Sequence, residues 1–251
     1  MSAALGHRHD HADDLEMLVL TGLTKHFGSV RVIDGLDLTV QGGELVGILG
    51  PNGAGKSTLF NLIAGVLSPT EGHVIYRGHD ITRTKPWVRC RRGIGRTYQV
   101  PKPFGHMTVF ENVLAAAVHG GGHTIGHARR DAEEVLELTR LAPRHAQRAG
   151  TLSLLSLKQL ELAKALAQRP RLLLLDEIAG GLTDAECELL INVIDAVRKT
   201  GTTIVWIEHV IHVLKRLASR LAVLYGGSII ADGMPEAVLA DAKVQEVYLG
   251  A

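Results

Sequence analysis

The sequence has 251 residues, 46% of them hydrophobic, which is enough for one large domain or for a core with a subdomain. Its 27 basic and 26 acidic residues give a net charge of +1, which argues against nucleic acid as the main partner. No apolar run reaches the roughly 18 residues of a membrane span. Cys90 and Cys187 lie far apart, which favours a reducing compartment over a disulfide scaffold.

The first 16 residues are polar and rich in His and Asp, and we expect a mobile tail rather than a signal peptide. Two groups of histidines raise the question of a metal site: His7, His9 and His11 in the tail, and His119, His123 and His127 further on. The first group has no rigid frame. The second has helical spacing, but three consecutive glycines oppose a helix there. We therefore favour solvated histidines in both places.

The next feature is a buried strand followed by a glycine-rich turn. "ELVGILG" (44–50) is continuously apolar, and "GPNGAGKST" (50–58) fits the phosphate-loop pattern G-x-x-x-x-G-K-[ST] between a strand and a helix. Glycines let backbone N–H groups approach phosphate, while the lysine reaches the β- and γ-phosphates and the serine binds Mg²⁺. The predicted nucleotide-binding residues are Gly50, Pro51, Asn52, Gly53, Ala54, Gly55, Lys56, Ser57 and Thr58.

Further along, helical patterns alternate with apolar runs. "DAEEVLELTRLA" (131–142) predicts an amphipathic helix with Val135, Leu138 and Ala142 on one face. "RLLLLDE" (171–177) and "TTIVWIEH" (202–209) predict buried strands, and residues 220–233 predict a hairpin that turns at Gly226 and Gly227. The alternation predicts an α/β fold with a mainly parallel sheet covered on both faces.

Polar residues end two of the predicted strands and complete the chemistry. Asp176 ends an apolar strand, where its carboxylate can hold Mg²⁺ beside the phosphate loop. Glu177 follows and can act as the base that activates water. His209, alone, reads as a capped core histidine, but together with the other two strand ends it is a candidate contact for the γ-phosphate.

These motifs, in this order, resemble the ATP-binding subunit of an ABC transporter from about residue 17 to the end. The resemblance implies a P-loop NTPase (RecA-like) core, an N-terminal antiparallel β part and a helical subdomain at about 103–167. It makes Phe27 of "LTKHFG", 29 residues before Lys56, the aromatic residue that stacks on adenine, although Phe27 could also be simple core. "RTYQ" carries Gln99, which would contact Mg²⁺ or the attacking water.

The subgroup resembled is the importers of branched-chain amino acids and related small amides or urea, through "RTYQ", "MTVFENV" and "VYLG" (247–250). The resemblance implies an ATPase that binds ATP and Mg²⁺ peripherally at the cytoplasmic face of the cell membrane. Its partners would be a second ABC ATPase subunit, two transmembrane permease subunits and, indirectly, an external substrate-binding protein. The segment after Gln99 would touch the membrane subunit.

Three departures from the family pattern stand out. Ile178 replaces a usual proline, and Thr183–Asp184 replaces Asp or Asn followed by Pro. The signature segment reads "LSLLS" (152–156): Ser153, 23 residues before Asp176, keeps the serine that would contact nucleotide, but Leu155 replaces the glycine and Ser156 the glutamine. In a dimer this segment would face the partner's phosphate loop.

The signature leaves two hypotheses open. The chain either hydrolyses ATP to drive transport, or it binds nucleotide with weak or no hydrolysis at one composite site and acts in gating or assembly. A heterodimer with a partner that has an intact signature is favoured, unless Leu155 simply packs along its helix with Leu162 and Leu166. A soluble ABC protein acting on DNA or ribosomes is disfavoured, because the chain has no long coiled-coil insertion and no second ATPase half.

Overall fold

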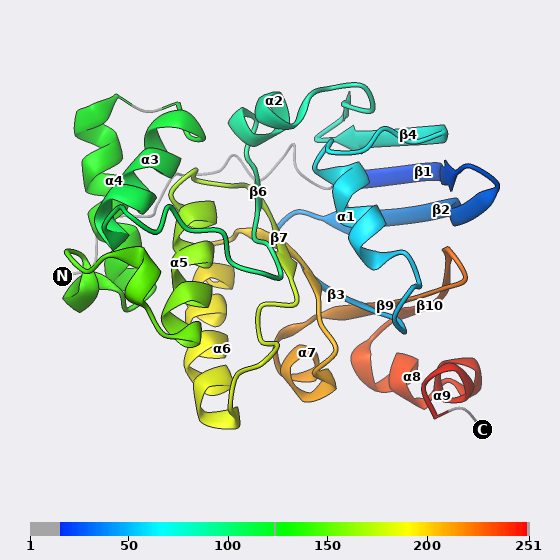
Figure 1. Ribbon diagram of the computed structural model, residues 1–251. Helices are drawn as coiled ribbons and strands as arrows, with labels where there is room; N and C mark the ends of the chain where they lie inside the picture. Colours follow the sequence, from blue (N-terminus) through cyan, green and yellow to red (C-terminus); the bar gives the residue numbers. More distant parts are fainter. Residues whose placement is uncertain (1–15, 123, 250–251) are drawn as a thin grey trace.

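The computed structural model describes residues 16–122 and 124–249, and it contains two β-sheets with helices around them (Figure 1). The smaller sheet has the strand order β2-β1-β4-β5 and is antiparallel. Its strands are β1 (Glu16–Phe27), β2 (Val30–Gln41), β4 (Glu71–Tyr76) and β5 (His79–Asp80). This sheet matches the predicted N-terminal antiparallel part.

The larger sheet has the order β10-β9-β3-β8-β7-β6 and is parallel except for the last hairpin. Its strands are β3 (Leu45–Leu49), β6 (Ile94–Arg96), β7 (Leu172–Asp176), β8 (Thr203–Ile207), β9 (Arg220–Tyr225) and β10 (Ser228–Gly233). The predicted strands after residues 44, 171 and 202 are therefore confirmed. So is the hairpin, whose turn residues Gly226 and Gly227 both have positive φ, the region glycine adopts without strain.

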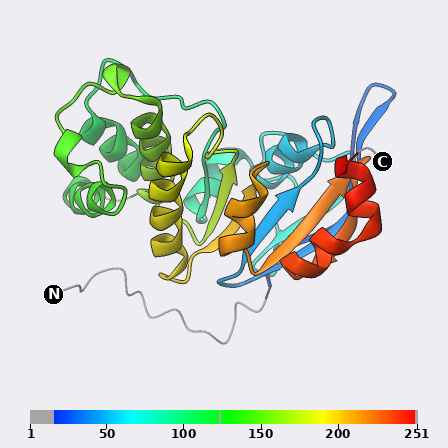
Figure 2. The same cartoon turned by 90° about the horizontal axis from the view of Figure 1, so that it is seen from below.

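Nine α-helices lie within the described ranges. They are α1 (Lys56–Ile63), α2 (Pro86–Arg91), α3 (Val109–His119), α4 (Ile125–Leu138), α5 (Leu154–Leu166), α6 (Asp184–Arg198), α7 (Ile211–Leu217), α8 (Pro235–Ala240) and α9 (Ala242–Leu249). Short 3-10 turns occupy Ala142–Arg144 and Ala149–Thr151. In Figure 2, α6, α7 and α8 cross in front of the larger sheet.

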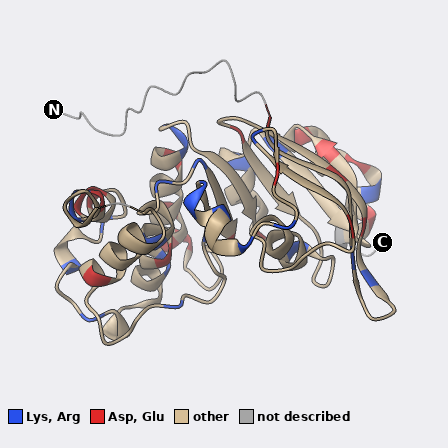
Figure 3. Cartoon of the chain, turned by 90° about the horizontal axis from the view of Figure 1, so that it is seen from above, with Lys and Arg blue, Asp and Glu red and all other residues tan. Residues whose placement is uncertain are grey.

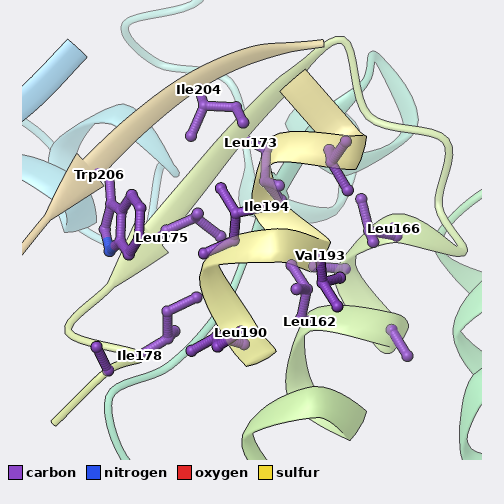
Figure 4. Close-up of a cluster of buried hydrophobic side chains, with 14 of the residues drawn as sticks. Leu162, Leu166, Leu173, Leu175, Ile178, Leu190, Val193, Ile194, Ile204 and Trp206 are labelled. Carbon is purple, nitrogen blue, oxygen red and sulfur yellow. The ribbon is translucent and has the colours of Figure 1, made fainter. Parts of the chain in front are cut away.

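The central strands β3, β7 and β8 of the larger sheet are buried on both faces, because their residues are apolar apart from Asp176 and Thr203. In β7, Leu173 and Leu175 face the cluster formed with α5 and α6, whereas Leu172 and Leu174 face the cluster that contains α1. Figure 4 shows the first cluster, to which Trp206 of β8, Leu175 of β7 and Ile194 of α6 belong. This arrangement fixes the carboxyl ends of β3, β7 and β8 along one edge, from which polar side chains project.

Helices α3, α4 and α5 come between β6 and β7 in the chain and gather beside the larger sheet (Figure 1). The prediction for 131–142 was partly wrong: α4 begins earlier, at Ile125, and ends at Leu138. Arg140 has a φ of 60°, which stops the helix, so Ala142 falls in a 3-10 turn rather than on the predicted face. Val135 is buried as expected.

The glycines that follow His119 do end a helix, since α3 stops at His119. His7, His9, His11 and His123 lie outside the described residues, as does nearly all of the predicted tail. Within the described ranges, no group of three or more His, Cys, Asp or Glu side chains could hold a metal ion. No helix of those ranges is long and apolar enough to cross a membrane. Basic and acidic segments occur in both the helical and the sheet-rich parts (Figure 3).

Candidate functional site

The glycine-rich turn connects β3 to α1, as the motif predicts. Gly55 is the N-cap of α1 with a φ of 104°, and a Cβ there would come within 2.8 Å of Ile33 Cδ1 and the Val32 carbonyl oxygen. No side chain caps this end of the helix. The first turn of α1 therefore keeps its N–H groups, and the positive end of the helix, available to an anion.

Lys56 is the first residue of α1, and its side chain folds back over the turn. Its Nζ donates to the carbonyl oxygens of Gly50 at 2.6 Å and Pro51 at 3.0 Å, and the residue is only 6% exposed. Burial lowers the pKa of this ammonium, an effect that the carboxylates of Glu177 and Asp176 partly oppose. The lysine is thus held next to both acids of the predicted site.

The remaining residues of the turn differ in exposure in a way that suits a phosphate cradle. Asn52, Gly53 and Ser57 are exposed, whereas Gly50 and Ala54 are buried and hold the loop on the sheet. A Cβ at Gly50 would lie 2.3 Å from the Leu224 carbonyl oxygen, so only glycine fits there. The intermediate residues are Pro51, Gly55 and Thr58.

Glu177 follows β7, and the structure brings Gln99 and His209 to it. Gln99 Nε2 donates to Glu177 Oε2 at 2.5 Å, and His209 Nε2 lies 2.7 Å from Glu177 Oε1. The Glu177 backbone has a φ of 46°, a conformation that costs energy for a residue with a side chain. Gln99, Glu177 and His209, predicted from separate segments, therefore form one cluster centred on the Glu177 carboxylate.

Asp176, the last residue of β7, is buried and pairs with Arg96 of β6. Arg96 Nη2 lies 3.0 Å from Asp176 Oδ2. Burial raises the pKa of this carboxyl, and the Arg96 guanidinium opposes that rise. The other oxygen, Asp176 Oδ1, is buried and has no hydrogen-bond partner in the described structure. A carboxylate oxygen without a partner at this strand end fits a hard cation such as Mg²⁺.

Sequence reasoning missed three residues of this region: Arg96, Glu208 and Lys158. Arg96 packs between the rings of Phe60 and Tyr98 while it holds Asp176. Glu208, which is almost fully buried, accepts N–H bonds from Ala179 at 2.8 Å and from His209 at 3.0 Å. Arg96 is the last residue of β6 and Glu208 directly follows β8, so a charged residue at the end of an apolar strand was the available signal for these two.

Phe27 ends β1 and is 46% exposed, with Lys25 Nζ 5.3 Å from the centre of its ring. The alternative that Phe27 is a core residue was therefore wrong. An exposed ring is free to stack on a flat partner.

The signature-like segment opens α5, and Ser153 is its N-cap. Ser153 Oγ accepts the N–H of Ser156 at 3.4 Å and bonds to the Ser156 hydroxyl at 3.2 Å. Leu155 and Leu157 are both half-buried. Of the two, Leu157 packs against the core. This helix begins where the family pattern predicts, but the Ser153 hydroxyl is already bonded to Ser156 of the same helix.

The other departures have structural roles. Ile178 is fully buried in the cluster around α6. Thr183 is the N-cap of α6 and forms a capping box with Glu186. Asp184 is the first residue of that helix, where its negative charge interacts favourably with the helix dipole. The threonine and aspartate therefore start α6 without the usual proline.

The comparison with protein families gives a match to the ABC transporter family over residues 33–180. The chain belongs to this family, so its fold is that of a P-loop NTPase with a mainly parallel sheet, as predicted. Members of the family bind nucleotide and hydrolyse ATP, and they dimerise and work with transmembrane permease subunits.

Individual relatives give a finer picture. The chain is 33% identical over 254 residues to the probable branched-chain amino acid transport ATP-binding protein LivG of Methanocaldococcus jannaschii, which covers 95% of this chain and 99% of the relative. It is 32% identical to the lipopolysaccharide export system ATP-binding protein LptB of Haemophilus influenzae, with 94% and 98% covered. A crystal structure of an ATP-binding cassette in its ADP conformation superposes with a TM-score of 0.86 at 32% identity, with 94% and 99% covered.

Proposed function

We propose that this chain is the ATP-hydrolysing subunit of an ABC importer for branched-chain amino acids or related small amides. One observation carries the catalytic part: Gln99 and His209 both bind the carboxylate of Glu177, beside the lysine of the phosphate loop. The similarity to LivG supports the solute class, and the run "RTYQ" points to the same subgroup. The similarity to LptB leaves export as the alternative direction.

Each predicted residue has a role in this proposal. The N–H groups of the phosphate loop and Lys56 bind the phosphates of ATP, and Phe27 stacks on adenine. Ser57, Asp176 and Gln99 would hold Mg²⁺, which would supply positive charge to neutralise the β- and γ-phosphates. Glu177 takes the proton of the attacking water, while His209 keeps the glutamate oriented and reaches the γ-phosphate.

We infer the position of the chain at the membrane from an exposed apolar surface that could bind a membrane protein. Apolar side chains stand exposed on α2 and on the segment around Gln99, where soluble proteins keep few of them: Trp87, Tyr98, Val100 and Phe104. We assign this surface to a transmembrane permease subunit. The chain then works at the cytoplasmic face of the membrane, and the solute contacts the permeases and an external binding protein instead.

A second candidate function rests on the start of α5. In the proposed dimer, Leu154 and Leu155 face the partner's nucleotide where the family has a phosphate-binding turn, and Ser153 already bonds within its own helix. Hydrolysis at that composite site would be weak, and the chain would act there in gating or assembly. A heterodimer whose partner has an intact signature keeps one efficient site, built on Lys56, Asp176 and Glu177 of this chain.

The test is steady-state ATP turnover of the purified chain and of the complex co-purified with its permeases. We expect turnover in the complex, and we expect Glu177→Gln to bind MgATP but to lose at least about a hundredfold in rate, because an amide cannot accept the proton. Turnover by Glu177→Gln equal to the parent would exclude Glu177 as the base. Tight binding without turnover in the complex would favour the second candidate.

A further inference from the structure

A buried lysine lies one turn into α5, close to the catalytic cluster. Lys158 is 3% exposed, and burial lowers the pKa of its ammonium. Four nearby carboxylates oppose this lowering: Glu208, Glu177, Asp176 and Glu161. A buried ammonium is costly unless its hydrogen bonds are satisfied. Its position therefore indicates that its contacts matter.

Lys158 Nζ donates to two backbone carbonyl oxygens, those of Gln99 at 2.8 Å and Glu177 at 3.2 Å. These are the two residues whose side chains bond to each other. One ammonium from α5 thus ties together the segment that follows β6 and the segment that follows β7.

A second contact joins the start of α5 to the loop that follows Glu177. Leu154, which is 44% exposed, places its Cδ2 3.3 Å from where a Cβ on Gly181 would stand. Glu177 itself has a positive φ, and such a backbone persists only where its surroundings hold it. Leu154 and Lys158 lie one helical turn apart. Leu154 lies against Gly181 of this loop, and Lys158 bonds to the Glu177 carbonyl oxygen at its start.

We propose that Lys158 is a positioning residue that couples the signature-like turn to the base of the same chain. This inference rests on the proposed function. In the dimer, the start of α5 faces the partner's nucleotide, whereas Gln99 and Glu177 serve the nucleotide of their own chain. A shift of α5 at one composite site is passed by Lys158 to the carbonyl groups of Gln99 and Glu177, and so to the other site.

The physical basis is the strength of charge-assisted hydrogen bonds from a buried ammonium. Their loss removes the Lys158 donor from the Gln99 carbonyl oxygen and leaves the Glu177 carbonyl oxygen with the N–H of Gly180 at 3.3 Å. Displacement of a catalytic group by about 1 Å can cost on the order of a hundredfold in rate. Lys158 bonds to backbone at the cluster and not to the phosphate loop, so its loss affects the rate more than ATP binding.

The experiment compares Lys158→Met with Lys164→Met in the full-length protein. Lys164 lies on the same helix and donates to the Lys102 carbonyl oxygen at 2.8 Å and to Glu161 at 2.9 Å, so it matches the contact but touches no catalytic residue. We expect kcat for ATP to fall about ten- to hundredfold in Lys158→Met with KM changed less than about twofold. Lys164→Met should retain the parent's kcat. Equal kcat values for the two variants would overturn the proposal.

Hydrogen exchange of the nucleotide-free proteins gives a readout that does not need hydrolysis. We expect faster amide exchange in peptides covering 97–101 and 177–181 in Lys158→Met, and parental exchange there in Lys164→Met. Parental exchange in both variants would overturn the coupling even if the chain hydrolyses ATP. Faster exchange in Lys158→Met, together with a parent protein that lacks ATP turnover, would uphold the positioning role and refute the hydrolytic function. If Lys158→Met fails to fold, Lys158→Gln, which keeps an uncharged donor, replaces it with the same expectations.

Discussion

Helices α1 and α5 both begin at positions that the family pattern assigns to phosphate, yet the two beginnings differ. Helix α1 starts at Gly55 with no side-chain cap, and the Lys56 ammonium lies over the turn that precedes it. Helix α5 starts at Ser153, whose hydroxyl bonds to Ser156, and leucines follow it. The start of α1 stays open to an external anion, whereas at the start of α5 one backbone N–H is already bonded to the N-cap serine.

Two further helices show what a fully closed end looks like. In α3 and α6 a threonine N-cap and a glutamate form reciprocal capping boxes: Thr108 with Glu111, and Thr183 with Glu186. Such ends gain stability from their own residues and have little to offer a ligand. The α5 end lies between these extremes, since one serine caps it and no acid completes the box. Helix ends thus divide into those built for stability and those left for a ligand.

The largest effect is expected from removing the ammonium beside the open end of α1. Lys56→Ala should weaken MgATP binding about ten- to a hundredfold, because a hydrogen bond from a cation to a charged partner contributes about 1.5–3 kcal/mol. Isothermal titration calorimetry measures this. Lys199→Ala, at the exposed end of α6, is the control and should bind as the parent does. Unchanged affinity in Lys56→Ala would refute the phosphate-loop assignment.

The next effect concerns opening the α5 end. Leu155→Gly combined with Ser156→Gln should raise ATP turnover of the homodimer by about tenfold, because backbone donors can then approach the partner's phosphate. Turnover of the homodimer and of the reconstituted complex should be measured together. An unchanged rate in a parent that is already fast would show that the leucine is tolerated and that the degenerate turn still works.

A smaller effect should separate the two ends by stability. Ser153→Ala should lower the free energy of unfolding by about 1 kcal/mol, since it removes the N-cap of α5. Ser57→Ala, at an exposed position of α1, is the matched change, because no side-chain hydrogen bond of Ser57 occurs in the described structure. Urea unfolding without nucleotide measures both. Equal losses would remove the distinction between an open and a closed end.

The smallest effect comes from the closed end of α6 and depends on pH. Hydrogen bonds from the backbone and hydroxyl of Thr183 lower the pKa of Glu186. A lowered carboxyl pKa stabilises the fold above the ordinary carboxyl pKa, and this stabilisation is lost as the pH falls through the folded value. Glu186→Ala should therefore lower Tm by about 2 °C near neutral pH and by less at about pH 3.

Glu186→Gln provides the control for that titration. The amide keeps an acceptor for the Thr183 N–H but cannot take up a proton in this range. Its Tm difference from Glu186→Ala should stay constant with pH, as measured by thermal scans across the same buffers. A constant difference between the parent and Glu186→Ala would show that the charge of Glu186 contributes nothing to the cap.

The fold and the catalytic segments could be predicted because they follow from local rules. Apolar runs that end in Asp176 or His209 are legible as buried strands of a parallel sheet, and the glycine spacing before Lys56 determines a turn. The predicted end of the helix at 131–142 was wrong because Arg140 takes a left-handed conformation that no local preference announces. The capping role of Thr183 was missed because it was read only as a departure from a motif.

The sequence alone determined which residues could do chemistry, since residue type fixes donors, acceptors and charge. Tertiary structure alone decided which of them meet: Arg96 with Asp176, and Lys158 with the carbonyl groups of Gln99 and Glu177. These pairs are separated by 80, 59 and 19 residues along the chain. Their meeting depends on strand order and on the docking of α5, because a contact between distant residues is set by how whole elements pack and not by the local pattern of either segment.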